Sequence, residues 1–234
     1  MNKELEKVIT RPDTWVAKQY PDYVSKNKGT FLRSKSLSTG FDSMDKVLHL
    51  SGWPLGTNIE LIGESHVNGN MSLLIPAMKS LSHQNRWHIF IAPPYVPYAP
   101  MLTNKGIDAK KILLIHPKTK AELLWSAEQA LRSKTCSTVF SWLGPVKYEY
   151  NELQKLHLAA KKDDVLSVFF IEGTEQTTPT PSVLRLLMSS YEKITVLKQR
   201  GGKQNITVQL PSREYGFVQS QPDACVLKKG VGIQ

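Results

Sequence analysis

Residues 111–142, KILLIHPKTKAELLWSAEQALRSKTCSTVFSW, contain the pattern that decides the fold. An apolar run over Lys111–His116 precedes a predicted helix over Thr119–Ser133, and a second apolar run follows over Ser137–Trp142. Continuous apolar runs of this length are typical of strands that are buried on both faces. Two such strands joined through a helix need a crossover connection, so this stretch predicts a parallel pair of strands with the helix packed on the sheet.

The same alternation continues on both sides of this unit. Further strands are predicted over Asn58–Ile62, Trp87–Ala92 and Val165–Ile171, and a second helix over Tyr150–Lys161. A short helix near the start of the pattern has an apolar face made of Phe41, Met44, Val47 and Leu48.

Toward the C-terminus the pattern changes. Residues 182–188 predict a short helix, and residues 191–199 and 204–210 predict two strands. Gly201 and Gly202 lie between these strands, where glycine supplies the positive φ of a tight hairpin turn. The sequence therefore predicts an α/β fold with three layers: a mostly parallel central sheet, helices on both of its faces, and a C-terminal antiparallel β-hairpin.

Length and composition fit one domain with appendages. The chain has 234 residues, of which 41% are hydrophobic and 21% charged, which excludes wholesale disorder and a coiled coil. No apolar run reaches the roughly 18 to 20 residues of a membrane span, and no signal-peptide core is evident, so we expect a cytoplasmic protein without a membrane partner. The two cysteines, Cys136 and Cys225, are far apart, which argues against a disulfide scaffold and a structural zinc site.

The surplus of basic residues is concentrated near the two ends of the chain. Thirty Lys and Arg against twenty Asp and Glu give a net charge of +10. Residues 1–36 contain eight basic and four acidic side chains, and residues 191–234 contain seven and three. Such a surplus suits either phosphate contacts or ordinary solubility, and the charge alone leaves both open.

A proline-rich segment follows the predicted strand over Trp87–Ala92. Residues 91–100 contain four prolines together with Tyr95 and Tyr98. Proline cannot continue a strand or a helix, so the chain must leave the sheet here. The carboxyl end of a parallel strand is where α/β proteins place ligand sites, which makes Tyr95 and Tyr98 candidates for contact with a partner. The alternative is a rigid loop that packs both rings onto the domain.

The loop after the predicted strand over Asn58–Ile62 occupies the place of a nucleotide-binding P-loop. That motif needs four residues between its glycines and then Lys and Ser or Thr, because the lysine reaches the phosphates and the hydroxyl holds Mg²⁺. Here five residues separate Gly63 from Gly69, and Asn70 and Met71 follow. We therefore predict a degenerate loop that hydrolyses no nucleotide and needs no cofactor.

Two other kinds of catalytic site lack part of their motif. Ser65 and His66 follow a strand, as in a hydrolase nucleophile elbow, but Val67 stands where that elbow needs glycine. The six histidines show no ligand spacing on a common helix face, so we predict no metal site.

Cations also surround the turn of the C-terminal hairpin. Lys198, Arg200 and Lys203 flank Gly201 and Gly202. Glycine lets a backbone approach a partner closely, and cations pair with phosphates or carboxylates. These five residues are therefore candidates for contact with DNA or a protein partner. The alternative is a solvated hairpin whose charges only keep the protein soluble.

Several of these stretches resemble the RecA class of ATPases. Residues 37–63 are similar to the entry into the RecA core through Ser38-Thr39-Gly40 and Gly52-Trp53-Pro54-Leu55-Gly56. A closer similarity is to the ImuA group of RecA-like proteins, also described as SulA-like. It rests on residues 91–100 (IAPPYVPYAP), 124–133 (LWSAEQALRS) and 198–202 (KQRGG). The similarity covers most of the chain up to the end of the predicted hairpin.

The resemblance implies a RecA-like fold without its catalytic residues. The P-loop lysine and hydroxyl of RecA fall at Asn70 and Met71, its water-activating glutamate at Pro94, and its magnesium-linked aspartate at Trp142. Without these groups the phosphates, the metal and the attacking water cannot be positioned. The resemblance therefore implies a protein that is not an enzyme.

As to function, the resemblance to the ImuA group implies a non-catalytic accessory factor of SOS-induced translesion DNA synthesis. The implied partners are an ImuB-like homologue of Y-family polymerases, with RecA and single-stranded DNA as further candidates. The alternative is a SulA-type inhibitor of cell division that binds the tubulin-like protein FtsZ, because SulA proteins are similar to the stretch from Asn58 to Ile171. A third hypothesis, a diverged nucleotide hydrolase or a hydrolase acting through Ser65, lacks the motif residues it needs.

The expected organisation has three parts. Residues 1–36 form an N-terminal helix and a basic arm, residues 37–219 the RecA-like domain without a working P-loop, and residues 220–234 a basic tail.

Overall fold

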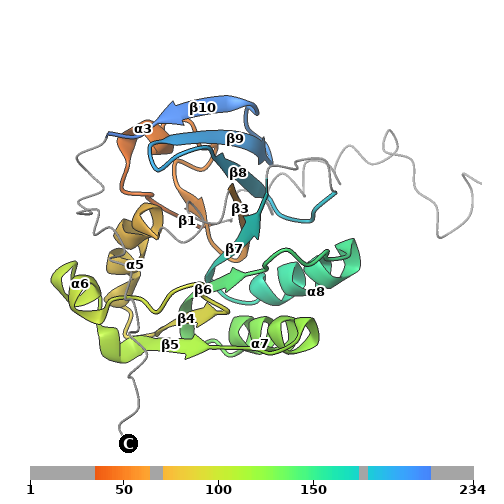
Figure 1. The fold of residues 1–234 in the computed structure, drawn as a ribbon. Helices are drawn as coiled ribbons and strands as arrows, with labels where there is room; N and C mark the ends of the chain where they lie inside the picture. The colour runs from red at the N-terminus through yellow and green to blue at the C-terminus, as the bar shows by residue number, and fades with distance from the viewer. Residues whose placement is uncertain (1–34, 64–70, 174–178, 212–234) are drawn as a thin grey trace, which may run out of the picture.

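The computed structural model describes residues 35–63, 71–173 and 179–211 of the chain (Figure 1). The predicted N-terminal helix, all but the end of the basic arm, and the basic tail lie outside these residues.

Strands and helices alternate through the described part of the chain as the sequence predicts. The strands are β1 (Ser36–Leu37), β2 (Trp53–Pro54), β3 (Thr57–Gly63), β4 (Trp87–Ile91), β5 (Ile112–Ile115), β6 (Cys136–Trp142), β7 (Leu166–Glu172), β8 (Leu184–Met188), β9 (Lys193–Gln199) and β10 (Ile206–Gln209). The α-helices are α3 (Asp42–Asp45), α5 (Ile75–Ser82), α6 (Ala99–Asn104), α7 (Lys120–Arg132) and α8 (Tyr150–Ala160), and the 3₁₀ helices are η2 (Ser72–Leu74) and η3 (Ala109–Lys111).

One sheet contains eight of these strands, in the order β10-β9-β8-β3-β7-β6-β4-β5. The strands from β8 to β5 run parallel to one another, whereas β9 and β10 are antiparallel to their neighbours. The predicted fold class is therefore confirmed, including its C-terminal antiparallel hairpin. We call the edge at which the parallel strands end the carboxyl edge, and the edge at which they begin the amino edge.

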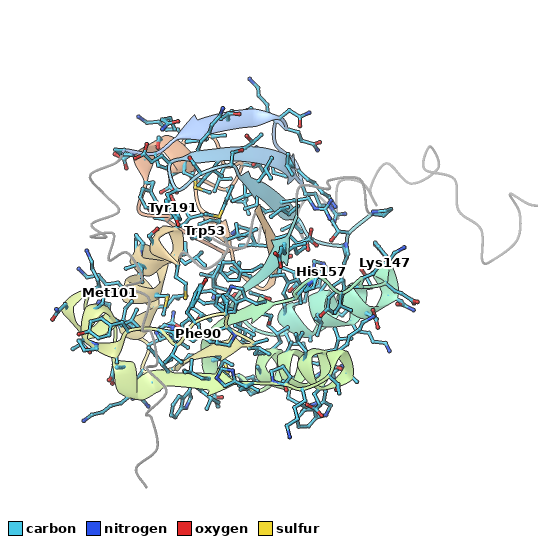
Figure 2. The ribbon with its side chains drawn as sticks, viewed as in Figure 1. Trp53, Phe90, Met101, Lys147, His157 and Tyr191 are labelled. Carbon is cyan, nitrogen blue, oxygen red and sulfur yellow. The ribbon has the colours of Figure 1, made fainter. Side chains whose placement is uncertain are left out.

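Helices cover both faces of the sheet (Figure 1). On one face, α7 and α8 pack onto alternate residues of the central strands, such as Val139 and Phe169. On the other face, α3, α5 and α6 pack onto the residues between them, such as Phe140 and Phe170. Figure 2 shows Phe90 and Trp53 inside the molecule, on this second side. Successive side chains of a strand point to opposite faces, so a strand covered on both faces is mostly apolar, and its polar side chains need partners inside the protein.

The N-terminus of α7 is capped by the residue that the sequence indicates. The hydroxyl of Thr119 accepts a hydrogen bond from the backbone N–H of Glu122, at 3.2 Å. The carboxylate of Glu122 accepts from the backbone N–H of Lys118, at 2.7 Å, and not from that of Thr119 as in a full capping box. Both bonds satisfy N–H groups that have no partner within the helix.

Residues 182–188, for which the sequence predicts a short helix, form β8 instead. This strand pairs in parallel with β3 and antiparallel with β9. Leu184, Leu186 and Met188 lie in the core on one face, and Arg185 is also buried. The helix prediction is wrong because a short apolar run fits both periodicities, and pairing with two neighbouring strands selects the extended form.

A buried ion pair accounts for the charged residue in β8. Nε of Arg185 donates to Oε2 of Glu60 on β3 at 2.7 Å, and both side chains are buried. Oε1 of Glu60 accepts hydrogen bonds from the hydroxyls of Thr180 and Ser182. A charge is tolerated in a protein interior only when it is paired and hydrogen-bonded, so this network ties β8 to β3 in one register.

The turn of the C-terminal hairpin packs against an earlier part of the chain. Gly201 has a φ of +86°, and a Cβ atom at this position would lie 2.8 Å from Nε2 of His49. The side chain of Gln199 accepts a hydrogen bond from the backbone N–H of His49 at 2.8 Å and donates to the carbonyl of Val47 at 3.2 Å. Glycine is therefore needed at residue 201 both for its backbone conformation and for this close approach.

Candidate functional site

The proline-rich loop leaves the sheet at its carboxyl edge and exposes an uncharged surface. Ala92, directly after β4, has a φ of +54°, and its N–H donates to the carbonyl of Ile115 at 2.8 Å. The loop then presents Tyr95, Val96 and Tyr98, whose exposed fractions are 69%, 74% and 68%. The alternative in which both tyrosine rings pack onto the domain is therefore wrong.

A cavity of about 300 Å³ lies beside this loop, at the ends of β4, β6 and β7. Its apolar lining is made of Ala92, Pro94, Pro117, Leu123, Trp142, Leu143, Val146 and Phe170. Its polar lining is made of Lys118, Thr119, Lys120, Tyr148 and Glu172, with Gly144 between the two groups. Together, the cavity and the exposed loop form a continuous surface at the carboxyl edge.

Aromatic rings stack at the ends of β4, β6 and β7. The ring of Trp142 is parallel to that of Phe170, at 3° and 4.3 Å between centroids, and lies 6.1 Å from the ring of Phe90. The resemblance to RecA implies the magnesium-linked aspartate at Trp142 and the water-activating glutamate at Pro94. Neither side chain offers an oxygen for a metal or a base for a water molecule, so the edge is suited to apolar contact.

Lys120, at the carboxyl edge, makes its contacts with other residues of the same chain. Nζ of Lys120 lies 2.7 Å from Oε2 of Glu152 and 5.0 Å from the centroid of the Tyr148 ring. The hydroxyl of Tyr148 donates to the carbonyl of Leu143 at 2.9 Å. Burial, and then the charge of Glu152, raise the pKa of the Tyr148 hydroxyl. The hydrogen bond from Lys120 lowers the pKa of Glu152, so the ion pair stays charged at neutral pH.

The degenerate nucleotide-binding loop is described only at its two ends. Gly63 is the last residue of β3, and its carbonyl accepts a hydrogen bond from the N–H of Gly173 at 3.0 Å. Met71 precedes η2 and packs partly buried against the core. Gly69 and Asn70, like Ser65, lie outside the described residues. Among the residues that are described, no group of His, Cys, Asp and Glu side chains could hold a metal ion.

The C-terminal candidates divide into two groups. The amine of Lys198 donates to the carbonyl of Thr180 at 2.8 Å, and burial lowers its pKa against the opposing charge of Glu60. A Cβ atom at Gly202 would lie 2.6 Å from Cδ of Gln199. Packing inside the protein therefore accounts for glycine at this position, as it does at Gly201. Arg200 and Lys203 are exposed and remain candidates for contact with a partner.

Sequence reasoning missed part of the exposed apolar surface. Val146, in the loop after β6, is 49% exposed and lines the cavity. Val146 follows the carboxyl end of a strand, as Tyr95 does, so the criterion that selected Tyr95 from the sequence could also have selected Val146. Trp125 is 65% exposed on α7, although its neighbours in the sequence suggest core or edge packing.

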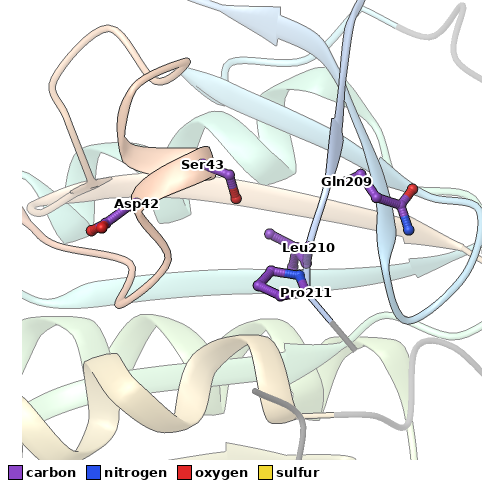
Figure 3. Close-up of a pocket in the computed structure, with 5 residues that line it drawn as sticks. All are labelled: Asp42, Ser43, Gln209, Leu210 and Pro211. Carbon is purple, nitrogen blue, oxygen red and sulfur yellow. The ribbon is translucent and has the colours of Figure 1, made fainter. Parts of the chain in front are cut away.

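A second hollow, of about 370 Å³, lies between α3 and the end of β10, toward the other end of the strand order. Figure 3 shows its lining of Asp42, Ser43, Gln209, Leu210 and Pro211. Pro211 is the last described residue of the chain, and we assign this hollow no ligand.

Comparison with known proteins identifies the family. The family model "Cell division inhibitor SulA" matches residues 57–167, from the start of β3 into β7, and this segment includes the proline-rich loop. The chain is a distant homologue of the SulA proteins. These relatives support the SulA-type alternative better than the translesion role, and a family named for inhibition agrees with a chain that is not an enzyme.

The similarity to individual SulA proteins is partial. SulA of Edwardsiella piscicida is 32% identical over 74 residues, which cover 32% of this chain and 44% of that protein. SulA of Pseudomonas aeruginosa is 36% identical over 78 residues, which cover 32% of this chain and 48% of that protein. SulA of Klebsiella aerogenes is 28% identical over 121 residues, which cover 51% of this chain and 71% of that protein. The chain thus spans less than half of the length of the first two relatives.

A solved SulA structure also aligns with this chain. The crystal structure of SulA from Pseudomonas aeruginosa aligns at 31% sequence identity, covering 50% of this chain and 98% of that chain, with a TM-score of 0.40. In the described part of the present chain, no helix is long and apolar enough to span a membrane.

Proposed function

We propose that this protein is a SulA-type inhibitor of cell division that acts in the cytoplasm by binding FtsZ. The observation that carries the proposal is the SulA match over residues 57–167, which includes the whole of β3 to β6 and the loop between β4 and α6. An inhibitor of this kind needs a binding surface and no catalytic group, in agreement with Pro94 and Trp142 at the degenerate positions.

We place the contact at the carboxyl edge of the sheet. Residues 92–104 contain no charged side chain, and Tyr95, Val96 and Tyr98 are exposed within them. The centres of protein interfaces are depleted of charge and enriched in aromatic residues. The adjoining cavity, with its floor of Trp142 and Phe170, suits an apolar anchor side chain of the partner. Nucleic acid would instead need cations within the loop, and residues 92–104 contain none.

The experiment that tests the function measures division and FtsZ assembly together. Expression of the full chain in a bacterial host should produce filamentous cells, and an FtsZ variant resistant to SulA should restore division. The purified protein should lower GTP-dependent FtsZ polymerisation in a light-scattering assay. Normal cell length at high expression, together with unchanged polymerisation, would reject the proposal.

The contact surface is tested by the double variant Tyr95→Ala/Tyr98→Ala. Because aromatic residues at the centre of an interface carry much of the binding energy, the affinity for FtsZ should fall by about tenfold or more. Both rings are exposed, so thermal stability should stay close to that of the wild type. The matched control is Trp125→Ala, an exposed aromatic on α7, which should keep full affinity. Equal affinity of the double variant and the control would remove the loop from the interface.

A second candidate function is an accessory role in translesion synthesis with an ImuB-like partner, RecA or single-stranded DNA. The observation in its favour is that β8, β9 and β10, which complete the sheet, lie outside the segment matched by the SulA family. Co-expression with matching ImuB-like and polymerase partners should then raise damage-induced mutagenesis without filamentation. Filamentation without a rise in mutagenesis would reject the accessory role and support the division inhibitor.

A further inference from the structure

The amino edge of the sheet differs in charge from the carboxyl edge. Exposed cations lie just before β5, β6 and β7 and around the turn of the β9–β10 hairpin, which is at the same edge because β9 is antiparallel to β8. We call the exposed lysines among them the amino-edge cluster: Lys110, Lys134, Lys161, Lys162 and Lys203. They come from four separate segments of the chain, and the topology of the sheet places them along one edge.

Three acidic side chains near this edge have partners among other basic residues, and a fourth, Asp108, accepts a hydrogen bond from the backbone N–H of Lys110 at 2.9 Å. The carboxylate of Asp163 pairs with Arg86, and that of Asp164 pairs with Lys35. Glu128 pairs with Arg132 along α7. The five lysines of the amino-edge cluster therefore outnumber the acidic side chains near them, and the edge keeps a surplus of positive charge.

Electrostatic contacts show that the central members of the cluster are neighbours. The Arg86–Asp163 pair joins the start of β4 to the end of α8, next to Lys161 and Lys162. The pKa of His157 is lowered to about 4, first by burial and then by the charges of Lys161, Arg200 and Lys198. A buried imidazole surrounded in this way stays neutral at physiological pH, so His157 adds no charge of its own to this edge.

The arrangement of these cations indicates the kind of anion. In the sheet order the cluster lies at β5, β6, β7 and the end of β9, and neighbouring strands are about 4.8 Å apart, so these residues form a spaced row along the edge and not a pocket for a single ion. The edge also presents Trp87, 38% exposed, with Nζ of Lys111 at 5.3 Å from its ring centroid. A row of flexible cations beside an exposed aromatic ring is the combination that binds the backbone and bases of a nucleic-acid strand.

From this row we infer that the amino edge is a binding surface for single-stranded nucleic acid, contacted through its phosphates without base specificity. A protein partner is a poorer match, because a protein interface needs an apolar centre and that feature lies at the opposite edge. The inference goes beyond the proposed division inhibitor, since it concerns another surface and another class of partner, and it assigns a defined surface to the single-stranded DNA of the second candidate function.

The test is fluorescence anisotropy with the full chain and a labelled 30-nucleotide single strand of mixed sequence, over a series of salt concentrations. The triple variant Lys134→Ala/Lys161→Ala/Lys162→Ala should bind at least tenfold more weakly at low salt. The slope of log K against log salt should be about two units shallower for this variant. Each phosphate contact releases counterions on binding, and the variant makes up to three fewer such contacts. All three lysines are exposed, so the melting temperature should not change appreciably.

A matched control removes the same net charge from the carboxyl edge. Lys118, Lys147 and Lys193 are exposed there, and Figure 2 shows Lys147 on the outer surface ahead of α8. The variant Lys118→Ala/Lys147→Ala/Lys193→Ala should keep the wild-type affinity and salt slope. Equal effects of the two triple variants, or no effect of either, would overturn the assignment to the amino edge. Binding of poly-glutamate as tight as that of the strand would overturn the choice of nucleic acid.

Discussion

Arg185 and Glu60 show at the scale of single residues how much one buried pair contributes. Arg185→Met leaves a buried carboxylate without its cation, so the free energy of unfolding should fall by about 3–5 kcal/mol in urea titrations. The matched control is Arg132→Ala, whose ion pair with Glu128 lies at the surface and should be worth less than about 1 kcal/mol. Similar losses in both variants would show that the network around Glu60 does not stabilise the fold.

His88 makes stability depend on pH. Its Nε2 lies 3.0 Å from the hydroxyl of Ser82 and its Nδ1 3.0 Å from that of Thr138. The Ser82 hydroxyl donates to the carbonyl of Met78, so it accepts from Nε2, and Nδ1 accepts from Thr138. The ring is fully buried, and burial lowers its pKa from 6.5 to about 4.

The sign follows from proton binding. Below pH 6.5 the unfolded chain binds a proton at His88 that the folded protein excludes until the pH approaches 4, so stability falls as the pH falls through this range. Between pH 7 and pH 5, His88 should cost about 2 kcal/mol, measured by urea unfolding at both pH values. His88→Gln should lose this part of the pH dependence. An identical dependence in both proteins would mean that His88 does not titrate on unfolding.

At the scale of elements, the hairpin turn is held by the contact between Gly201 and His49. Gly201→Ala adds a Cβ that meets the imidazole at 2.8 Å, in addition to the cost of a positive φ. We expect a loss of about 2 kcal/mol in the free energy of unfolding, of which His49→Ala in the same chain should restore the steric part. The control is Gly144→Ala, which has a φ of +64° and open space around it, and should cost about 1 kcal/mol. Equal losses at both glycines would show that the contact with His49 is not tight.

The predictability of each element follows from its burial. The strands β3, β4, β6 and β7 are covered on both faces, so each is rich in apolar residues and stands out in the sequence in spite of a few buried polar side chains. β8 has the same burial, but its short run also fits a helix, and only pairing with β3 and β9 decides between them.

The candidate site was predictable to a different extent. Prolines end β4 and so mark the loop with Tyr95 and Tyr98, whereas the stack of Trp142 on Phe170 joins two strands that are distant in sequence. Gly201 and Gly202 suggest an external contact from sequence alone, and their true neighbours, His49 and Gln199, become visible only when the hairpin has packed. Local sequence patterns do not predict contacts between segments that are distant in the sequence, and these contacts are the part of the site that could not be predicted.

At the scale of the whole molecule, the eight-stranded sheet separates two surfaces of different chemistry. The carboxyl edge presents an uncharged aromatic loop beside an apolar cavity, and the amino edge presents a row of cations. The two sets of substitutions, Tyr95→Ala/Tyr98→Ala and Lys134→Ala/Lys161→Ala/Lys162→Ala, should therefore act independently. A combined variant should lose as much affinity for FtsZ as the tyrosine variant alone and as much affinity for the single strand as the lysine variant alone, because the sites share no residue.

The length of the strands sets the distance between these edges. β3 has seven residues, and at about 3.3 Å per residue it separates the two edges by roughly 23 Å. A partner seated on one edge therefore leaves the other accessible, and a single molecule can bridge both. A protein molecule bound to nucleic acid through its amino edge would hold its carboxyl edge at a high local concentration near that nucleic acid. The place where such a protein inhibits division would then depend on where the nucleic acid lies.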